Sequence, residues 1–206
     1  MLTLAIDCAT EACSVALFEG ENCVAGEFRL LGRGHAEQLV PMIAALPGRG
    51  EAQRILVALG PGSFTGVRVG LAAARALAFA WNAELLGYPT LSLIAAMAHR
   101  AIRPVPVAVV MTGGHGEWFV QRFTAGGVPA EALASRQPAD AEAHVGEEFI
   151  AGSQARALVA LRGHGEALDL LPDARAANLL APATLTSDIR PIYGRAPDAR
   201  LPASAP

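Results

Sequence analysis

The order in which short apolar runs and helical repeats follow one another constrains the fold of this chain most strongly. Three apolar runs come first, and helical segments then alternate with further runs. The runs are Leu2–Ile6, Cys13–Phe18, Cys23–Leu30, Ile55–Leu59 and Glu84–Gly87, and the helical segments are His35–Leu46, Phe64–Trp81 and Leu91–His99. Apolar runs of this length between helices are typical of buried strands. The pattern predicts an α/β fold with a mixed sheet flanked by helices.

The second half of the chain shows a weaker version of this order. It begins after Arg103-Pro104, and from Pro138 it is Ala-rich and mostly helical, with a Pro-punctuated tail. Its apolar runs are Val105–Met111, Trp118–Phe123 and Glu148–Ala151. Because the order of runs recurs, we expect an N-terminal subdomain, 1–102, and a shortened, degraded copy of it, 103–206, although no internal sequence repeat is visible.

Composition removes several classes of chemistry. All sixteen Lys and Arg positions are Arg, nineteen residues are acidic, and the formal net charge is −3. Without Lys the chain cannot build a P-loop, a Schiff base or a Ser/Lys dyad. Nucleic acid is expected to be contacted only indirectly, because neutralising phosphates needs clustered cations. The 52% of hydrophobic residues suffice for a core without disulfides or metals.

Cysteine and histidine spacing argues against a metal site. Cys8, Cys13 and Cys23 show no C-x-x-C spacing, and the five histidines form neither H-x-x-x-H nor H-E-x-x-H. The cysteines are interpreted as buried hydrophobes in a reducing compartment. The most apolar helical stretch carries Arg75, and the N-terminus lacks a basic leader. The expectation is a cytoplasmic protein without a membrane segment, a resident metal or a catalytic residue of its own.

Two stretches are candidate nucleotide or anion sites. In the first, Asp7 and Thr10 lie where a strand opens into a hairpin, although that hairpin has no glycine to let a phosphate approach; satisfying turn amides is the favoured alternative. In the second, a Gly-rich turn leads from a buried strand into a helix, whose first amides can bind an anion. An ordinary strand-to-helix turn is an equal alternative. The residues concerned are Gly60, Gly62, Ser63, Thr65 and Arg68.

Several of these segments resemble the bacterial TsaB (YeaZ) proteins, which have the actin-like ATPase (ASKHA) fold and help make threonylcarbamoyladenosine in tRNA. The resemblance covers about the first hundred residues well and the rest loosely. The segments are Leu4–Asp7, Thr10–Leu17, His35–Ile43, Leu59–Leu71, Leu77–Asn82, Gly116–Phe119 and Tyr193–Arg200. Members often have Asp-Ala-Arg before the Gly-Glu pair, where this chain has Met111–His115, which leaves any role of 111–117 open.

The resemblance implies an accessory subunit. The sister family, TsaD, places a metal-binding His-x-x-x-His where this chain has Thr90 and Ile94. Isoleucine has no donor atom, and a lone hydroxyl is a poor ligand for a transition metal. The expectation is a non-catalytic protein that supports a TsaD-type enzyme at position 37 of tRNAs, alongside a TsaE-type ATPase. It would have no cofactor of its own, with ATP used by the complex, and tRNA contacted through the complex.

The first two long helices are the expected contact with that partner, and the expected homodimer surface when the chain is alone. One helix has an apolar stripe, and the other has a ridge of small residues four apart. The alternative is that both pack on the chain's own sheet. A rival class of function is an actin-like-fold phosphotransferase or a metal-independent peptidase. The expected contact residues are His35, Leu39, Met42, Ile43, Gly66, Gly70 and Ala74.

Overall fold

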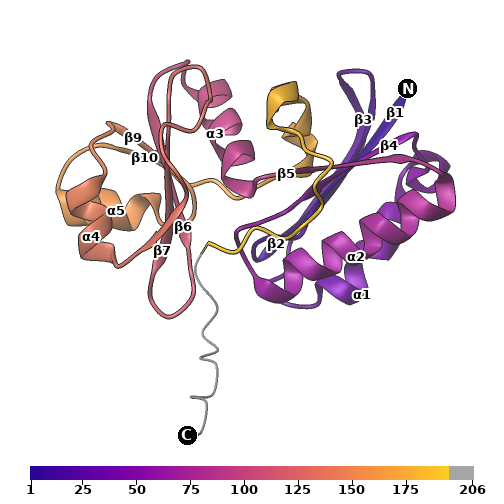
Figure 1. The fold of residues 1–206 in the computed structure, drawn as a ribbon, viewed down its shortest axis with the longest axis horizontal. Coiled ribbons are helices and arrows are strands. Elements are labelled where there is room, and N and C mark those ends of the chain that lie inside the picture. Colours follow the sequence, from indigo (N-terminus) through magenta and orange to yellow (C-terminus); the bar gives the residue numbers. More distant parts are fainter. Residues whose placement is uncertain (195–206) are drawn as a thin grey trace, which may run out of the picture.

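The chain folds into two sheets with helices on their outer faces and between them (Figure 1). The structure is a computed structural model that describes residues 1–194. Part of the tail that resembles the TsaB proteins, Arg195–Arg200, lies outside the described residues.

The first sheet has the strand order β3-β2-β1-β4-β5, in which β1 pairs antiparallel with β2 and parallel with β4. The second sheet has the order β10-β9-β6-β7-β8, in which β6 pairs antiparallel with β7 and parallel with β9. The two sheets therefore repeat one topology, and the expected α/β class is confirmed. The strands are β1 (Leu2–Asp7), β2 (Ala12–Glu19), β3 (Asn22–Leu30), β4 (Arg54–Ala58), β5 (Glu84–Tyr88), β6 (Val107–Thr112), β7 (Trp118–Phe123), β8 (Ala134–Arg136), β9 (Phe149–Ala151) and β10 (Glu166–Leu168).

The helices form three layers around these sheets (Figure 1). Two helices cover the outer face of the first sheet, two cover the outer face of the second, and one helix with a short 3-10 turn lies between the sheets. In that order, they are α1 (His35–Ala45) and α2 (Phe64–Trp81), α4 (Pro138–His144) and α5 (Ala155–Arg162), and α3 (Thr90–Ala101) with η2 (Ala174–Leu179). Two further 3-10 turns are η1 (Pro47–Gly50) and η3 (Pro182–Thr184).

Local sequence explains where α2 begins and ends. The Ser63 hydroxyl caps the helix by accepting a hydrogen bond from the Gly66 amide at 3.2 Å. Asn82 ends it in the left-handed region at φ 52°, a conformation that Asn adopts more readily than most residues. The predicted range Phe64–Trp81 is confirmed.

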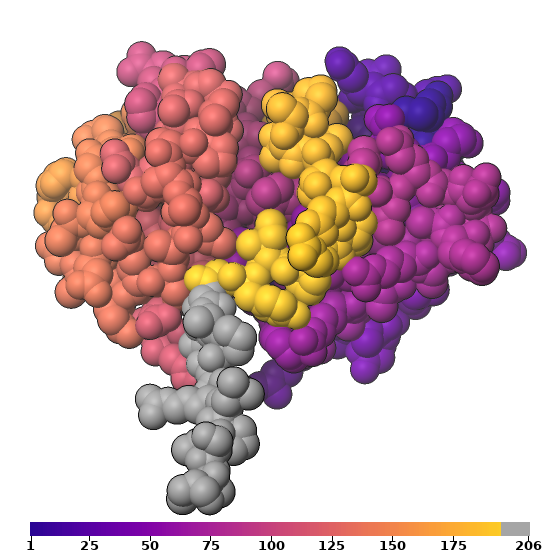
Figure 2. Space-filling model, in the orientation of Figure 1, coloured from indigo at the N-terminus to yellow at the C-terminus, as the bar shows by residue number. Residues whose placement is uncertain are grey.

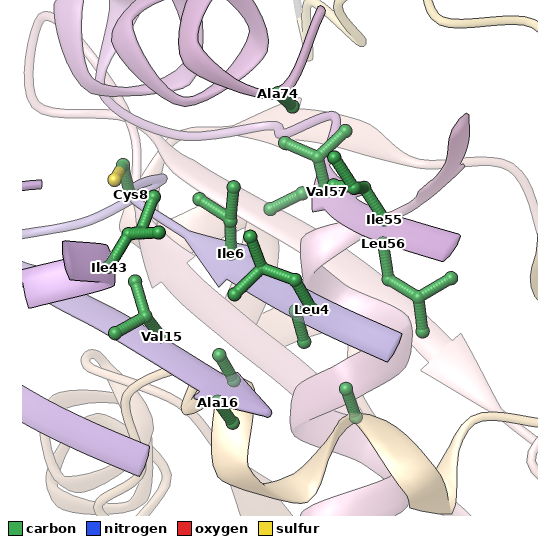
Figure 3. Packing of buried hydrophobic residues seen from close by; sticks show 14 of the residues in the cluster. Leu4, Ile6, Cys8, Val15, Ala16, Ile43, Ile55, Leu56, Val57 and Ala74 are labelled. Atoms are coloured by element: carbon green, nitrogen blue, oxygen red, sulfur yellow. The ribbon is translucent and has the colours of Figure 1, made fainter. Parts of the chain in front are cut away.

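Strand β6 shows why a continuous apolar run is needed in a sheet covered on both faces. Its side chains alternate, so that Val107, Val109 and Met111 pack with α3, whereas Ala108 and Val110 pack with α4 and α5. In the first sheet, Ile43 of α1 points toward Ile6 and Val15, and the small side chain of Ala74 brings α2 close to β4 (Figure 3).

The packing crosses the boundary expected at residue 102. Helix α3 contributes Leu91 and Ile94 to the core of the second sheet, whereas Ala174 and Ala177 of η2 belong to the core of the first. The amide of Ala174 donates to the Ser14 hydroxyl at 2.8 Å, which fixes η2 on β2. Figure 2 shows this C-terminal part of the chain, coloured yellow, between the two halves. The division into 1–102 and 103–206 stays a prediction.

No helix within residues 1–194 is both long and apolar enough to cross a membrane.

Candidate functional site

The glycines of the turn before α2 are needed by the chain itself. A Cβ at Gly62 would lie 1.9 Å from the Ala9 carbonyl oxygen, and one at Gly66 would lie 2.0 Å from that of Cys8. The Ser63 amide donates to the Ala9 carbonyl at 2.7 Å. The β1–β2 hairpin therefore rests directly on the start of α2. The ridge of small residues accommodates this hairpin, which is a structural reason for its glycines.

Asp7 is bonded within its own hairpin and to Tyr88, and its binding of a nucleotide or anion stays a prediction. Asp7 is 1% exposed and is not in the lining of the pocket that Thr10, Gly62 and Arg68 share. The Ala9 amide donates to Oδ1 at 2.9 Å, and the Tyr88 hydroxyl lies 3.1 Å from Oδ2. Burial raises the pKa of Asp7 to about 7. The Thr10 hydroxyl likewise accepts a hydrogen bond from the Ala12 amide at 3.2 Å, so both side chains bond to amides of the turn.

A pocket of about 650 Å³ lies where the two halves meet. The first half contributes the tip of the β1–β2 hairpin and the start of α2, and the second half contributes the β6–β7 hairpin and the start of β7. Residues 192–194 form a third wall. The lining residues are Ala9, Thr10, Glu11, Pro61, Gly62, Ser63, Phe64, Arg68, Met111, Thr112, Gly113, Gly114, Phe119, Ile192, Tyr193 and Gly194.

Four of the seven predicted nucleotide or anion residues line this pocket. They are Thr10, Gly62, Ser63 and Arg68. Thr65 is exposed but does not line it, and Gly60 lies behind it, with its carbonyl accepting a hydrogen bond from the Thr90 amide at 2.9 Å. Arg68 has the clearest role of the four, because its side chain is held between the Tyr193 hydroxyl, at 3.1 Å, and the Phe64 ring, at 3.5 Å from the centroid.

Sequence reasoning missed the second half of the pocket. Phe119, Met111 and Tyr193 come from distant parts of the chain, and none belongs to a local motif that would link it to the turn before α2. The two glycines at 113–114 indicated only a turn. A Cβ at Gly194 would lie 2.3 Å from the Phe119 ring, so this position requires glycine where the C-terminal segment meets β7.

The predicted partner-contact residues lie on the inner faces of α1 and α2. His35, Leu39, Met42 and Ile43 are at most 7% exposed, and Gly66, Gly70 and Ala74 are also buried. They face the sheet and the β1–β2 hairpin, because the apolar stripe of an amphipathic helix is the face that covers a core. These residues therefore pack inside this chain, and their contact with a partner stays a prediction. The helices α1 and α2 expose other residues on their outer faces.

No group of three or more His, Cys, Asp or Glu side chains within residues 1–194 is arranged to hold a metal ion.

Comparison with known proteins supports the resemblance seen in the sequence. The family model for TsaD, tRNA N6-adenosine threonylcarbamoyltransferase, matches residues 29–161. The tRNA threonylcarbamoyladenosine biosynthesis protein TsaB of Escherichia coli is 38% identical over 124 residues, which are 58% of this chain and 53% of that protein. TsaB of Haemophilus influenzae is 42% identical over 104 residues, which are 48% and 42% of the two chains. The matches span about half the length of these curated relatives.

Solved structures agree with the fold over most of the chain. YeaZ from Pseudomonas aeruginosa superposes with a TM-score of 0.76 at 28% identity, covering 93% of this chain and 99% of that one. A second structure is the ethanolamine utilization protein EutJ from Carboxydothermus hydrogenoformans, which superposes with a TM-score of 0.52 at 10% identity. The match covers 88% of this chain and 90% of EutJ, and it shows the fold alone. This likeness is consistent with an actin-like ATPase fold. Because the TsaD family model matches more than half of the chain, the chain belongs to the family that this model describes, and within it the chain is similar to the TsaB (YeaZ) proteins.

Proposed function

We propose that this chain is the non-catalytic subunit that binds and supports a TsaD-type enzyme forming N6-threonylcarbamoyladenosine at position 37 of tRNAs. The name of the E. coli relative supports the pathway, and the match to the TsaD family model supports a partnership between paralogues. In this proposal tRNA is contacted through the complex. ATP is used by the complex, which includes a TsaE-type ATPase, and this subunit contributes no cofactor.

One observation carries the non-catalytic part of the proposal. At the two positions where the TsaD resemblance places metal-binding histidines, Ile94 packs in the core of the second sheet and Thr90 is fully buried. Neither side chain faces the pocket between the halves. A metal-dependent transfer in that pocket would have no ligand from these two residues.

The exposed outer face of α1 and α2 is the surface that we assign to the partner. Phe79 is 91% exposed and Val40 is 57% exposed. Exposed alanines continue this face along both helices: Ala36 and Ala44 in α1, and Ala72 and Ala76 in α2. Burying a Phe side chain contributes about 1.5–3 kcal/mol, so a phenylalanine left in water at a helix surface favours association. In the absence of the enzyme, a homodimer would use the same face.

Reconstitution tests the subunit role. Threonylcarbamoyl transfer to tRNA is measured with the TsaD-type and TsaE-type proteins of the same organism, with and without this chain. Transfer is expected only when this chain is added to the enzyme, and not with the chain alone. Transfer by the chain alone, above a control without protein, would overturn the proposal, as would ATP or peptide hydrolysis by the purified chain at a catalytic rate.

A pair of substitutions tests the assigned surface. Phe79→Glu is expected to abolish co-purification with the TsaD-type subunit and to leave the melting temperature unchanged, because the side chain has almost no contacts to lose. Leu161→Glu on α5, at a residue 49% exposed, is the matched control and is expected to retain the partner. Full binding by Phe79→Glu would refute the surface, while reconstitution would still test the subunit role.

A further inference from the structure

We propose that the pocket between the two halves binds a small aromatic or apolar molecule that carries a single negative charge. This inference does not depend on the proposed function, because the pocket lies apart from the outer face of α1 and α2. Its walls bring together Phe64, Phe119 and Tyr193, with Met111 and Ile192 beside them. Pockets that hold small molecules are mostly apolar, with a few polar groups that orient the ligand.

Arg68 is the group that would bind the charge. Among the described residues that line the pocket, it is the only cation. The Arg68 guanidinium donates to the Tyr193 hydroxyl and lies over the Phe64 ring, and these two contacts orient it. A guanidinium that is already ordered loses less entropy when it binds a carboxylate, sulfonate or phosphate oxygen.

The same lining argues against a polyphosphate such as ATP. Glu11 also lines the pocket and its negative charge opposes that of Arg68, so the lining has no net positive charge to hold a ligand with several negative charges. Asp7, at the end of β1, is buried and bonded to its own hairpin and to Tyr88, so it is not available for a metal that would accompany the phosphates. The backbone of that hairpin also fills the space above Gly62 and Gly66 that a phosphate would need.

The size of the pocket decides between a small molecule and a larger partner. Its volume of about 650 Å³ lies in the middle of the range of small-molecule sites, roughly 300–1,000 Å³. The β6–β7 hairpin, the start of α2 and residues 192–194 close it on three sides. We therefore commit to a free small molecule as the occupant.

Fluorescent probes test this chemistry directly. The probe 8-anilinonaphthalene-1-sulfonate is an aromatic monoanion, and N-phenyl-1-naphthylamine is a similar aromatic molecule without the charge. The full chain is titrated with each, and the bound sulfonate is then displaced with AMP or with ATP and Mg²⁺. We expect one sulfonate site per chain, tighter binding of the sulfonate than of the amine, and no displacement advantage for ATP over AMP. Absence of saturable binding, or displacement by ATP more strongly than by AMP, would overturn the proposal.

Variants locate the probe. Arg68→Met should weaken sulfonate binding about tenfold, as expected for the loss of one charge-assisted contact, and leave amine binding unchanged. Tyr193→Phe keeps the ring but frees the guanidinium, so it should weaken sulfonate binding by a smaller factor. Arg156→Met on α5 removes the same charge from a distant surface and serves as the control. Phe79→Glu should leave the sulfonate affinity unchanged, which would show that the probe is not bound at the outer face of α2. Equal sulfonate affinity in Arg68→Met and Arg156→Met would refute the assignment.

Discussion

Replacing Asp7 by Asn should make the protein more stable at alkaline pH. The Tyr88 hydroxyl lies 3.1 Å from both the Ile6 carbonyl oxygen and Asp7 Oδ2, but it has one hydrogen to donate. A protonated Asp7 resolves this, because Oδ2 donates to Tyr88 and Tyr88 donates to Ile6. The Asn side-chain amide can make the same donation, and its oxygen can still accept from the Ala9 amide.

The size of the stability difference follows from the pKa of Asp7 in the folded and in the unfolded chain. Asp7 keeps its proton up to pH about 7 in the folded chain, whereas its ordinary value is 3.8. The folded state therefore binds more protons between these values, and the stability that neutral Asp7 contributes is full below pH about 4 and lost as the pH rises through about 7. A difference of about 3 pH units corresponds to about 4 kcal/mol.

Urea denaturation of the wild type and Asp7→Asn at pH 5 and pH 8 measures this effect. With a slope of about 2 kcal/mol per molar urea, the variant's midpoint should exceed that of the wild type by up to about 2 M at pH 8, and this difference should fall to about 0.8 M at pH 5. Asp169→Asn, at a surface ion pair with Arg156, is the control and should shift both midpoints little. A difference between wild type and Asp7→Asn that does not change with pH would refute the reasoning.

Three further predictions test the packing and the charge. Met42→Glu should lower the melting temperature sharply or prevent folding, because it places a charge in the core at a residue 1% exposed; a stable variant that fails to bind the partner would restore the original surface prediction. Gly66→Ala should cost several kcal/mol in chemical denaturation, because its Cβ would meet the Cys8 carbonyl, whereas Gly146→Ala meets nothing within 4 Å and should change stability by less than about 1 kcal/mol. The isolated subunit, with sixteen cations against nineteen acids, should bind tRNA weakly in filter-binding assays at physiological salt, and a tight complex with a steep salt dependence would contradict this.

Sequence reasoning predicted the first half of the fold because its signals are local. Ser63 and Asn82 mark the ends of α2, and the apolar runs of the first sheet are long and have clear turns between them. In the second half, β8 and β10 have three residues each and carry no periodic signal, so they were missed. The region beyond Pro138 is accordingly less helical than expected.

The candidate site was predictable only in part, for a physical reason. An apolar stripe such as Leu39 and Met42 fits a core and an interface equally well, and only the position of the sheet decides between them. An Asp at the end of a strand, such as Asp7, can bind a ligand or accept hydrogen bonds from the amides of its own turn, and the sequence does not distinguish these two roles. Tyr193 and Phe119 reach the pocket through tertiary packing, which single-sequence patterns do not encode.

The return of η2 to the first sheet has a consequence for how the chain folds during synthesis. A ribosome that has released only the first hundred residues leaves the inner face of β2, including Ser14, without the segment that covers it, and leaves α3 without the strands it packs on. Closing the first core requires contacts across a separation of 160 residues. Contacts this distant in sequence form late and slowly, so the nascent N-terminal half would be a substrate for chaperones rather than an independent folding unit.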